Sequence, residues 1–139
     1  PTIHVRLYLA FIMAWLTDET SQQQALLQLK GLNLDQFTTP ELPHLYGLTL
    51  LQLKLPKSES RRRALALTAL KKADELLVKM IELGREPSSD ILIDFDDRLN
   101  YYFNRGHTQY LTATLTKLKG GSFMTPRRLR LLKATQSSE

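Results

Sequence analysis

The sequence predicts an all-α fold: a right-handed stack of about three antiparallel helix hairpins, followed by a C-terminal helix. No segment shows the sustained alternation of β-branched residues that a strand requires. Prolines also divide the chain at regular intervals, since Pro1, Pro40, Pro87 and Pro126 delimit units of 39, 47 and 39 residues. Units of that length, built from two helices each, are typical of helical-hairpin arrays.

A motif that occurs twice supports the same fold. The first copy is Leu29-x-x-Leu32-x-x-x-x-Phe37-x-Thr39-Pro40, and the second is Leu115-x-x-Leu118-x-x-x-x-Phe123-x-Thr125-Pro126. We expect the two segments to superpose as equivalent junctions between helices, with Phe37 and Phe123 each packed between adjacent hairpins.

The first hairpin is predicted from an apolar run and two helix-end signals. Residues 3–17 are nearly all apolar, which indicates a helix buried on several sides. Thr20-x-x-Gln23 reads as a capping box that begins a second helix, and Gly31 supplies the left-handed conformation that ends it.

The middle unit is predicted to hold a short and a long helix. Thr39 with Pro40 reads as an N-cap followed by a proline at the first helical position, so a third helix should run to about Leu55. After a polar break, apolar residues recur at helical spacing from about Ser60 to Leu83. Gly84 should end this fourth helix.

Three further helices follow from similar signals. Ser88, Ser89 or Asp90 caps a fifth helix that ends at Gly106. A sixth is capped by Thr108, runs through Leu118 and breaks at Gly120-Gly121. A seventh begins at Thr125-Pro126 and dissolves into the polar segment from Thr135 onward.

Length and composition limit the class of protein. A chain of 139 residues fits one domain, here with units 1–39, 40–86 and 87–125 and a terminal helix 126–135. The absence of cysteine excludes disulfides, thiolate zinc sites and cysteine nucleophiles. The apolar run from Leu7 to Leu16 is too short to span a bilayer and lacks a signal-peptide cleavage pattern. Because the sequence begins at Pro1, an original targeting peptide could be missing.

Positive charge is concentrated in the second part of the chain. Residues 1–50 hold two basic side chains and four acids, whereas residues 51–139 hold seventeen and ten. The basic residues cluster at 61–63, 71–72, 117–119 and 127–130. Such clustering, with a net charge of +5, is expected of a protein that binds a polyanion, although solvated helix faces and a basic tail would give the same pattern.

Part of the chain resembles a known repeat family. Ala73-x6-Met80-x3-Gly84-x2-Pro87 resembles the second helix and inter-repeat turn of the pentatricopeptide repeat, an α-hairpin repeat of helical solenoids that bind single-stranded RNA. The segment from Phe95 to Gly106 resembles the family's first helix and the turn within its hairpin. The resemblance covers mainly residues 60–126. The unit after Pro87 is longer than a standard repeat, and Leu111 stands where a small residue is expected, which suggests a degenerate member or a fragment of a longer array.

The resemblance implies a mode of binding and a set of site residues. A side chain early in the first helix of each hairpin would read a base together with the residue that closes the repeat. Asp96 takes the early position, and Pro126 or Arg127 falls near the closing one. Aspartate is not the usual small amide or hydroxyl at that position, which favours nonspecific phosphate contact instead. The candidate RNA-binding residues are Arg61, Arg62, Arg63, Lys71, Lys72, Asp96, Arg127, Arg128 and Arg130.

Signals for catalysis are weak. His4, His44 and His107 are isolated, and no serine lies in a nucleophile pattern. Asp94, Asp96 and Asp97 could offer oxygen ligands to a cation, but adjacent positions on a helix point in different directions. Gly120-Gly121 lacks the lysine and serine of a phosphate-binding loop. We therefore expect no enzyme activity, metal or cofactor.

The sequence favours a noncatalytic helical-repeat module that binds single-stranded RNA or a ribonucleoprotein. The family resemblance implies a role in organellar RNA processing, stability or translation, and a location in mitochondria or another organelle matrix. One alternative is a protein-interaction scaffold of tetratricopeptide-like hairpins. A second is a small DNA-binding domain with a recognition helix that opens at Thr125. A basic binding face would favour RNA, and an apolar or mixed face would favour a protein partner.

Overall fold

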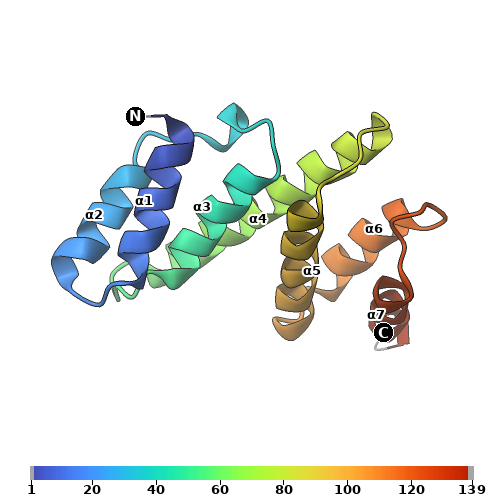
Figure 1. The fold of residues 1–139 in the computed structure, drawn as a ribbon. Coiled ribbons are helices and arrows are strands. Elements are labelled where there is room, and N and C mark those ends of the chain that lie inside the picture. Colours follow the sequence, from blue (N-terminus) through green and yellow to red (C-terminus); the bar gives the residue numbers. More distant parts are fainter. Residues whose placement is uncertain (1, 138–139) are drawn as a thin grey trace. The chain divides into compact units, whose positions relative to one another are not determined.

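The computed structural model describes residues 2–137, so Pro1, the first of the four spaced prolines, and residues 138–139 lie outside the described part. Within that part the chain forms seven α-helices and no strand, which confirms the all-α class (Figure 1). The helices are α1 (Ile3–Trp15), α2 (Glu19–Leu29), α3 (Glu41–Gln52), α4 (Glu59–Glu82), α5 (Ser89–Asn104), α6 (Thr108–Leu118) and α7 (Pro126–Ser137).

The chain separates into two compact units, Pro1–Lys79 and Met80–Glu139, with the boundary near the end of α4. The first unit contains α1, α2, α3 and most of α4. The second contains α5, α6 and α7. Each unit is described by itself below.

In the first unit, α1 packs against both α2 and α3, and Figure 1 shows it between them. The buried side chains of α1 are Leu7, Ala10 and Ala14, which lie on one face. The opposite face is exposed. The prediction that this helix is buried on several sides is therefore wrong for the outward face, since only α2 and α3 cover it.

Gln22 links three segments of the first unit. Its side-chain amide, buried in α2, donates hydrogen bonds to the carbonyls of Ala14 (2.8 Å) and Leu16 (2.5 Å) at the end of α1. Its carbonyl oxygen accepts the backbone N–H of Lys54 at 2.7 Å, just after α3. One side chain thus satisfies backbone groups at two helix ends that would otherwise lack partners.

Gly47 allows α3 and α4 to approach closely. A Cβ atom placed on Gly47 would lie 2.8 Å from Leu70 Cδ2 and 3.0 Å from the carbonyl oxygen of Ala66. Distances of this kind leave no room for a side chain. The absence of a side chain at this position therefore sets the distance between the two helices.

The helix ends confirm some sequence signals and correct others. Gly31, Gly84, Gly106 and Gly120 all have positive φ, as the predicted helix ends require. The predicted capping box at Thr20 is wrong, because Asp18 is the N-cap of α2 and accepts the backbone N–H of Ser21 at 2.9 Å.

The other predicted caps had mixed outcomes. Ser88 and Thr125 cap α5 and α7 by accepting backbone N–H groups, as predicted. Thr39 and Thr108 do not cap: the N-caps of α3 and α6 are Pro40 and His107, neither with a side-chain hydrogen bond. The third helix also ends at Gln52 instead of Leu55.

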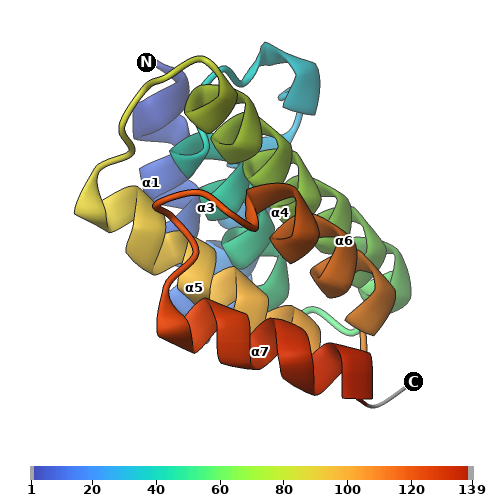
Figure 2. The same cartoon turned by 90° about the vertical axis from the view of Figure 1, so that its right-hand side faces the viewer.

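In the second unit, α6 packs against α5 and against α7, and Figures 1 and 2 both show α7 beside α6. The most deeply buried side chains of this unit include Phe95, Leu99, Tyr102, Leu111, Leu115 and Leu132. The Tyr102 and Tyr110 rings meet edge to face with their centroids 5.0 Å apart, which joins α5 to α6.

The two copies of the repeated motif share their connectivity but not their geometry. Each joins two helices, α2 to α3 and α6 to α7. The first contains a short 3₁₀ turn, Leu34–Gln36, and buries Phe37 against Tyr46 with ring centroids 6.1 Å apart. In the second, α6 extends three residues further into the motif and Phe123 is only half-buried.

Candidate binding surfaces

The arginine cluster 61–63 at the start of α4 divides into three different environments. Arg62 is 8% exposed and donates hydrogen bonds to the carbonyls of Leu55 and Lys57 in the preceding loop. Arg63 is exposed and pairs with Glu59 one helical turn away, with 2.6 Å between Nη2 and Oε1. Arg61 is exposed and lines a groove. Of these three candidate RNA-binding residues, Arg62 is therefore engaged in hydrogen bonds to the loop.

Asp96 and Arg128 contact each other. Arg128, in the first turn of α7, donates from Nε to Oδ1 of Asp96 at 2.9 Å and from Nη2 to Oδ2 at 3.0 Å. Its Nη1 donates to the carbonyl of Phe123 at 2.6 Å, and its guanidinium stands 5.5 Å from the centre of the Phe95 ring. Arg128 is 5% exposed. The candidate base-reading aspartate and one candidate phosphate-binding arginine therefore hold α7 against α5.

Arg127 and Arg130 remain exposed beside this ion pair. They line a small hollow of about 270 Å³ between α5 and α7, together with Asp96, Leu99, Asn100, Arg128, Leu131 and Ala134. Both arginines belong to α7, which carries no acidic residue in its first turn. Cations near a helix N-terminus face the positive end of its dipole, so they do not stabilise the helix itself.

Lys71 and Lys72 lie in the middle of α4 and are half-buried. Neither lines the groove or the hollow. Of the nine candidate residues, Asp96, Arg127, Arg128 and Arg130 line the hollow of the second unit, whereas Arg61 and Arg62 line the groove of the first.

Sequence reasoning missed a hollow in the first unit. It is an open groove of about 810 Å³ between α2, the end of α3, the loop after it and the start of α4. Apolar side chains form most of its surface: Leu26, Leu27, Leu29, Tyr46, Leu50, Leu55, Pro56 and Leu65. One sequence signal for the groove was the pair Leu26-Leu27. These two leucines lie outside the buried face of α2, which is formed by Gln22, Ala25 and Leu29.

The rim of the groove is mainly basic. Lys30, Lys57, Arg61 and Arg62 line it, against the single acid Glu19. Arg62 is bonded to backbone carbonyls, so Lys30, Lys57 and Arg61 are the exposed cations. An apolar surface with a basic rim complements an apolar segment that carries negative charge.

Tyr46 lies at the inner side of the groove. Burial raises the pKa of its hydroxyl above 10.0, so the group stays protonated at neutral pH. A protonated phenol is both a hydrogen-bond donor and an acceptor. Tyr46 thus provides an uncharged polar atom within an apolar lining.

Other features of the described residues bear on the sequence expectations. No three potential metal-binding side chains gather anywhere in 2–137, including around Asp94, Asp96 and Asp97. His44 is buried in α3, whereas His4 is exposed in α1. Over the same described range, no helix combines the length and the hydropathy needed to cross a bilayer.

A basic binding face would favour an RNA partner, and an apolar or mixed face would favour a protein partner. The two units differ in this respect. The groove of the first unit is apolar with a basic rim, and the hollow of the second is small with two exposed arginines.

Comparison of the chain with protein-family models, with curated proteins and with solved structures found no match.

Proposed function

We propose that this chain is a noncatalytic helical binding module whose first unit holds an acidic amphipathic helix of a partner protein in the groove between α2 and α4. The observation that carries the proposal is the groove itself, about 810 Å³ and lined mainly by leucine with a basic rim. This was the alternative function from the sequence, and the criterion stated there favours it for an apolar or mixed face.

A helix suits this groove better than an extended strand. The chain has no sheet edge among its described residues, so a strand would find no row of backbone partners. A helix satisfies its own backbone and presents apolar side chains at i, i+3, i+4 and i+7 to an apolar groove. Glutamate or aspartate beside those positions would meet Lys30, Lys57 and Arg61 at the rim.

The groove is also supported by a rigid local frame. Arg62 ties the loop after α3 to the start of α4, and Gln22 ties the same loop to α2. Leu29, Tyr46 and Leu50 are buried and form its inner wall. A wall that is fixed before binding reduces the entropic cost of association.

Selection from a displayed library of helical peptides tests the proposal. Peptides recovered on the intact chain are expected to share leucine at i, i+3, i+4 and i+7 with acidic residues beside them. Leu27→Asp, at a groove residue that is 53% exposed, should weaken their binding at least about tenfold, which corresponds to about 1.4 kcal/mol. Leu83→Asp, at a residue 62% exposed and outside the groove, is the matched control and should bind like the parent.

The proposal would fail if no selected peptide lost affinity on Leu27→Asp, or if basic peptides were enriched as strongly as acidic ones. Circular dichroism of both variants establishes that they are folded. Because Leu27 is exposed, its replacement removes contact surface from the groove without opening the core.

RNA binding by the second unit is the second candidate, and Arg127 and Arg130 favour it specifically. Both are exposed on α7 next to a hollow, directly after the segment, mainly residues 60–126, that resembles the pentatricopeptide repeat. On this interpretation the helices belong to a right-handed hairpin stack, and the protein acts in organellar RNA metabolism. Phosphates would contact the two arginines, and Asp96 would position Arg128 without reading a base.

Fluorescence anisotropy with single-stranded oligouridine and with duplex DNA, each at two salt concentrations, tests this candidate. The double variant Arg127→Gln/Arg130→Gln should flatten the logarithmic salt slope for single-stranded RNA by about 1.4, that is, about 0.7 for each phosphate contact. Lys117→Gln/Lys119→Gln removes two exposed cations from the end of α6 and serves as the control. Equal slopes for the two double variants would contradict a specific role for α7.

A further inference from the structure

The outward face of α1 carries an apolar stripe that no described residue of the first unit covers. Its residues are Val5, Tyr8, Leu9, Ile12, Trp15 and Leu16, at the spacing of one helix face and the residue that follows it, with exposed fractions of 40% to 59%. We call this surface the α1 stripe. It lies apart from the groove, since none of its residues lines that hollow.

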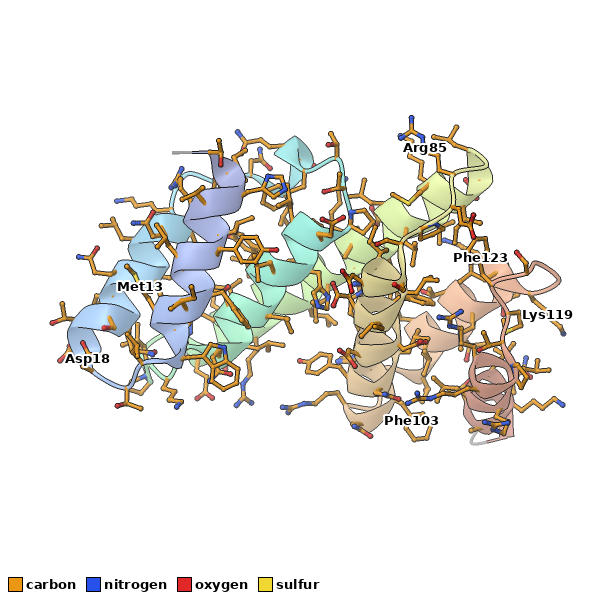
Figure 3. All side chains as sticks on the ribbon, viewed as in Figure 1. Met13, Asp18, Arg85, Phe103, Lys119 and Phe123 are labelled. Atoms are coloured by element: carbon orange, nitrogen blue, oxygen red, sulfur yellow. The ribbon has the colours of Figure 1, made fainter. Side chains whose placement is uncertain are left out.

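The α1 stripe carries no formal charge. Arg6 is the only lysine or arginine of α1, and it turns toward α2, where its Nη2 donates to the carbonyls of Gln28 and Lys30 at 2.8 Å each. The helix has no aspartate or glutamate. Figure 1 shows α1 in front of its neighbours, and Figure 3 shows its side chains, including Met13, which packs against the core. The uncharged outward face thus results from placing the one cation on the inner side.

The area of the stripe is near the amount that a dimer needs. Tyr8 and Trp15, as aromatic side chains, offer about 150 to 250 Å² each when fully accessible, and the four aliphatic side chains are smaller. Six side chains at roughly half exposure therefore leave at most on the order of 600 Å². Two copies would together bury at most about 1,200 Å², at the lower limit of stable specific interfaces. A single apolar patch of about 600 Å² is also at the upper end for a monomer.

The charge distribution allows a second copy to occupy this surface. The chain has a net charge of +5, so two copies repel each other across most pairs of surfaces. The α1 stripe is a large surface on which they can meet without bringing like charges together. Tyr8 and Trp15 are of the residue types that contribute most energy at interfaces.

The same absence of charge argues against an anionic membrane surface. Helices that lie in a lipid interface are rich in lysine and arginine on their polar face, which attract anionic headgroups. The only such residue of α1 is Arg6, and it is bonded to α2. Attraction to anionic lipid would therefore depend on cations outside α1.

We propose that the chain forms a twofold-symmetric homodimer in which the α1 stripe of one copy packs against that of the other. A twofold axis uses the same patch on both copies, so one apolar stripe is sufficient for both sides. The association depends on apolar burial and not on ion pairs. It should therefore persist or strengthen as salt is raised, because salt screens the repulsion between two positively charged chains.

Sedimentation velocity on the full chain over a range of protein concentrations tests the proposal. The parent should change from monomer to dimer with a dissociation constant of about 1 to 100 µM, as a small interface suggests. Ile12→Asp, at the most exposed position of the stripe, should shift that midpoint upward at least tenfold, or about 1.4 kcal/mol. Tyr8→Asp gives an independent second variant, and Leu83→Asp, on an exposed leucine outside the stripe, should dimerise like the parent.

A cysteine scan adds a direct measurement of proximity. The chain has no cysteine, so Ile12→Cys introduces a single thiol at the stripe. A bifunctional thiol reagent should link two copies of Ile12→Cys, and it should not link two copies of Leu83→Cys.

Several outcomes would overturn the homodimer. One is a parent that stays monomeric throughout the concentration range, and another is a dimer that survives both Ile12→Asp and Tyr8→Asp. A third is a monomer that binds vesicles of phosphatidylcholine with phosphatidylglycerol and loses that binding on Ile12→Asp, which would assign the stripe to a membrane. A stripe-dependent assembly larger than a dimer would contradict the twofold arrangement.

Discussion

Arg128 and Asp96 form a two-point ion pair that joins the first turn of α7 to α5, with donor–acceptor distances of 2.9 and 3.0 Å. Arg128 is almost completely buried, and its third hydrogen bond goes to the carbonyl of Phe123. A buried guanidinium needs such partners, because leaving it unpaired would cost several kcal/mol.

The first prediction concerns this pair. Asp96→Ala leaves Arg128 without its carboxylate partner and should lower the free energy of unfolding by about 2 to 4 kcal/mol. Asp97→Ala, at the exposed neighbouring carboxylate, is the matched control and should change it by less than about 0.5 kcal/mol. Urea unfolding followed by circular dichroism measures both. Equal effects of the two substitutions would show that the ion pair does not anchor α7.

The second prediction concerns the contact of α3 with α4. Gly47→Ala places a Cβ atom 2.8 Å from Leu70 Cδ2 and 3.0 Å from a backbone carbonyl, so the Leu70 side chain or the backbone of α4 must shift. We expect a loss of about 1 to 3 kcal/mol in the free energy of unfolding. Gly121→Ala is the control, because its Cβ would meet its nearest neighbour, the carbonyl of Leu118, at 3.6 Å without strain. If the melting temperature of Gly47→Ala equals that of the parent, the close approach is not required.

The third prediction concerns the cap of α2. Hydrogen bonds from the backbone N–H and the hydroxyl of Ser21 hold the pKa of Asp18 below 3.8. Because the folded pKa is lower than the unfolded one, the ionised cap stabilises the fold above pH 3.8 and loses that effect as the pH falls through the folded value. Asp18→Ala should therefore melt at a lower temperature than the parent at neutral pH.

The pH dependence supplies the control for that substitution. The difference in melting temperature between Asp18→Ala and the parent should shrink well below pH 3.8, where the carboxyl of the parent is protonated. Thr20→Ala, at the residue that the sequence pattern named as the cap, should melt like the parent at both values. A difference that stays constant with pH would attribute the effect of Asp18→Ala to something other than the carboxylate.

Local signals predicted the helices well because helix ends are set by a few adjacent residues. The positive φ of Gly84 and the caps at Ser88 and Thr125 depend only on the backbone next to them. The cap of α2 was missed because Asp18 and Thr20 are both good capping residues, and sequence alone does not show which one leaves the helix.

The binding surfaces were harder to predict because they depend on which side of a helix each residue occupies. Successive helical residues point about 100° apart, so a run such as 61–63 cannot present all its side chains to one ligand. Arg62 points inward and donates to carbonyls of the loop after α3, and only the tertiary structure places that loop beside Arg62. The groove combines α2 with α4 across more than thirty residues of sequence, and no local pattern encodes that juxtaposition.

The last prediction separates the roles of two neighbouring arginines. Arg62→Gln removes donors to the carbonyls of Leu55 and Lys57, so it should lower the free energy of unfolding by about 1 to 3 kcal/mol. Arg61→Gln, on the exposed rim of the groove, should leave stability within about 0.5 kcal/mol of the parent. It should instead weaken the binding of an acidic helical peptide and reduce the salt dependence of that binding, because one rim charge is lost. Thermal unfolding and peptide anisotropy at two salt concentrations measure the two effects on the same samples. If Arg61→Gln destabilised the fold as much as Arg62→Gln while peptide affinity stayed unchanged, the basic rim would have no role in recognition.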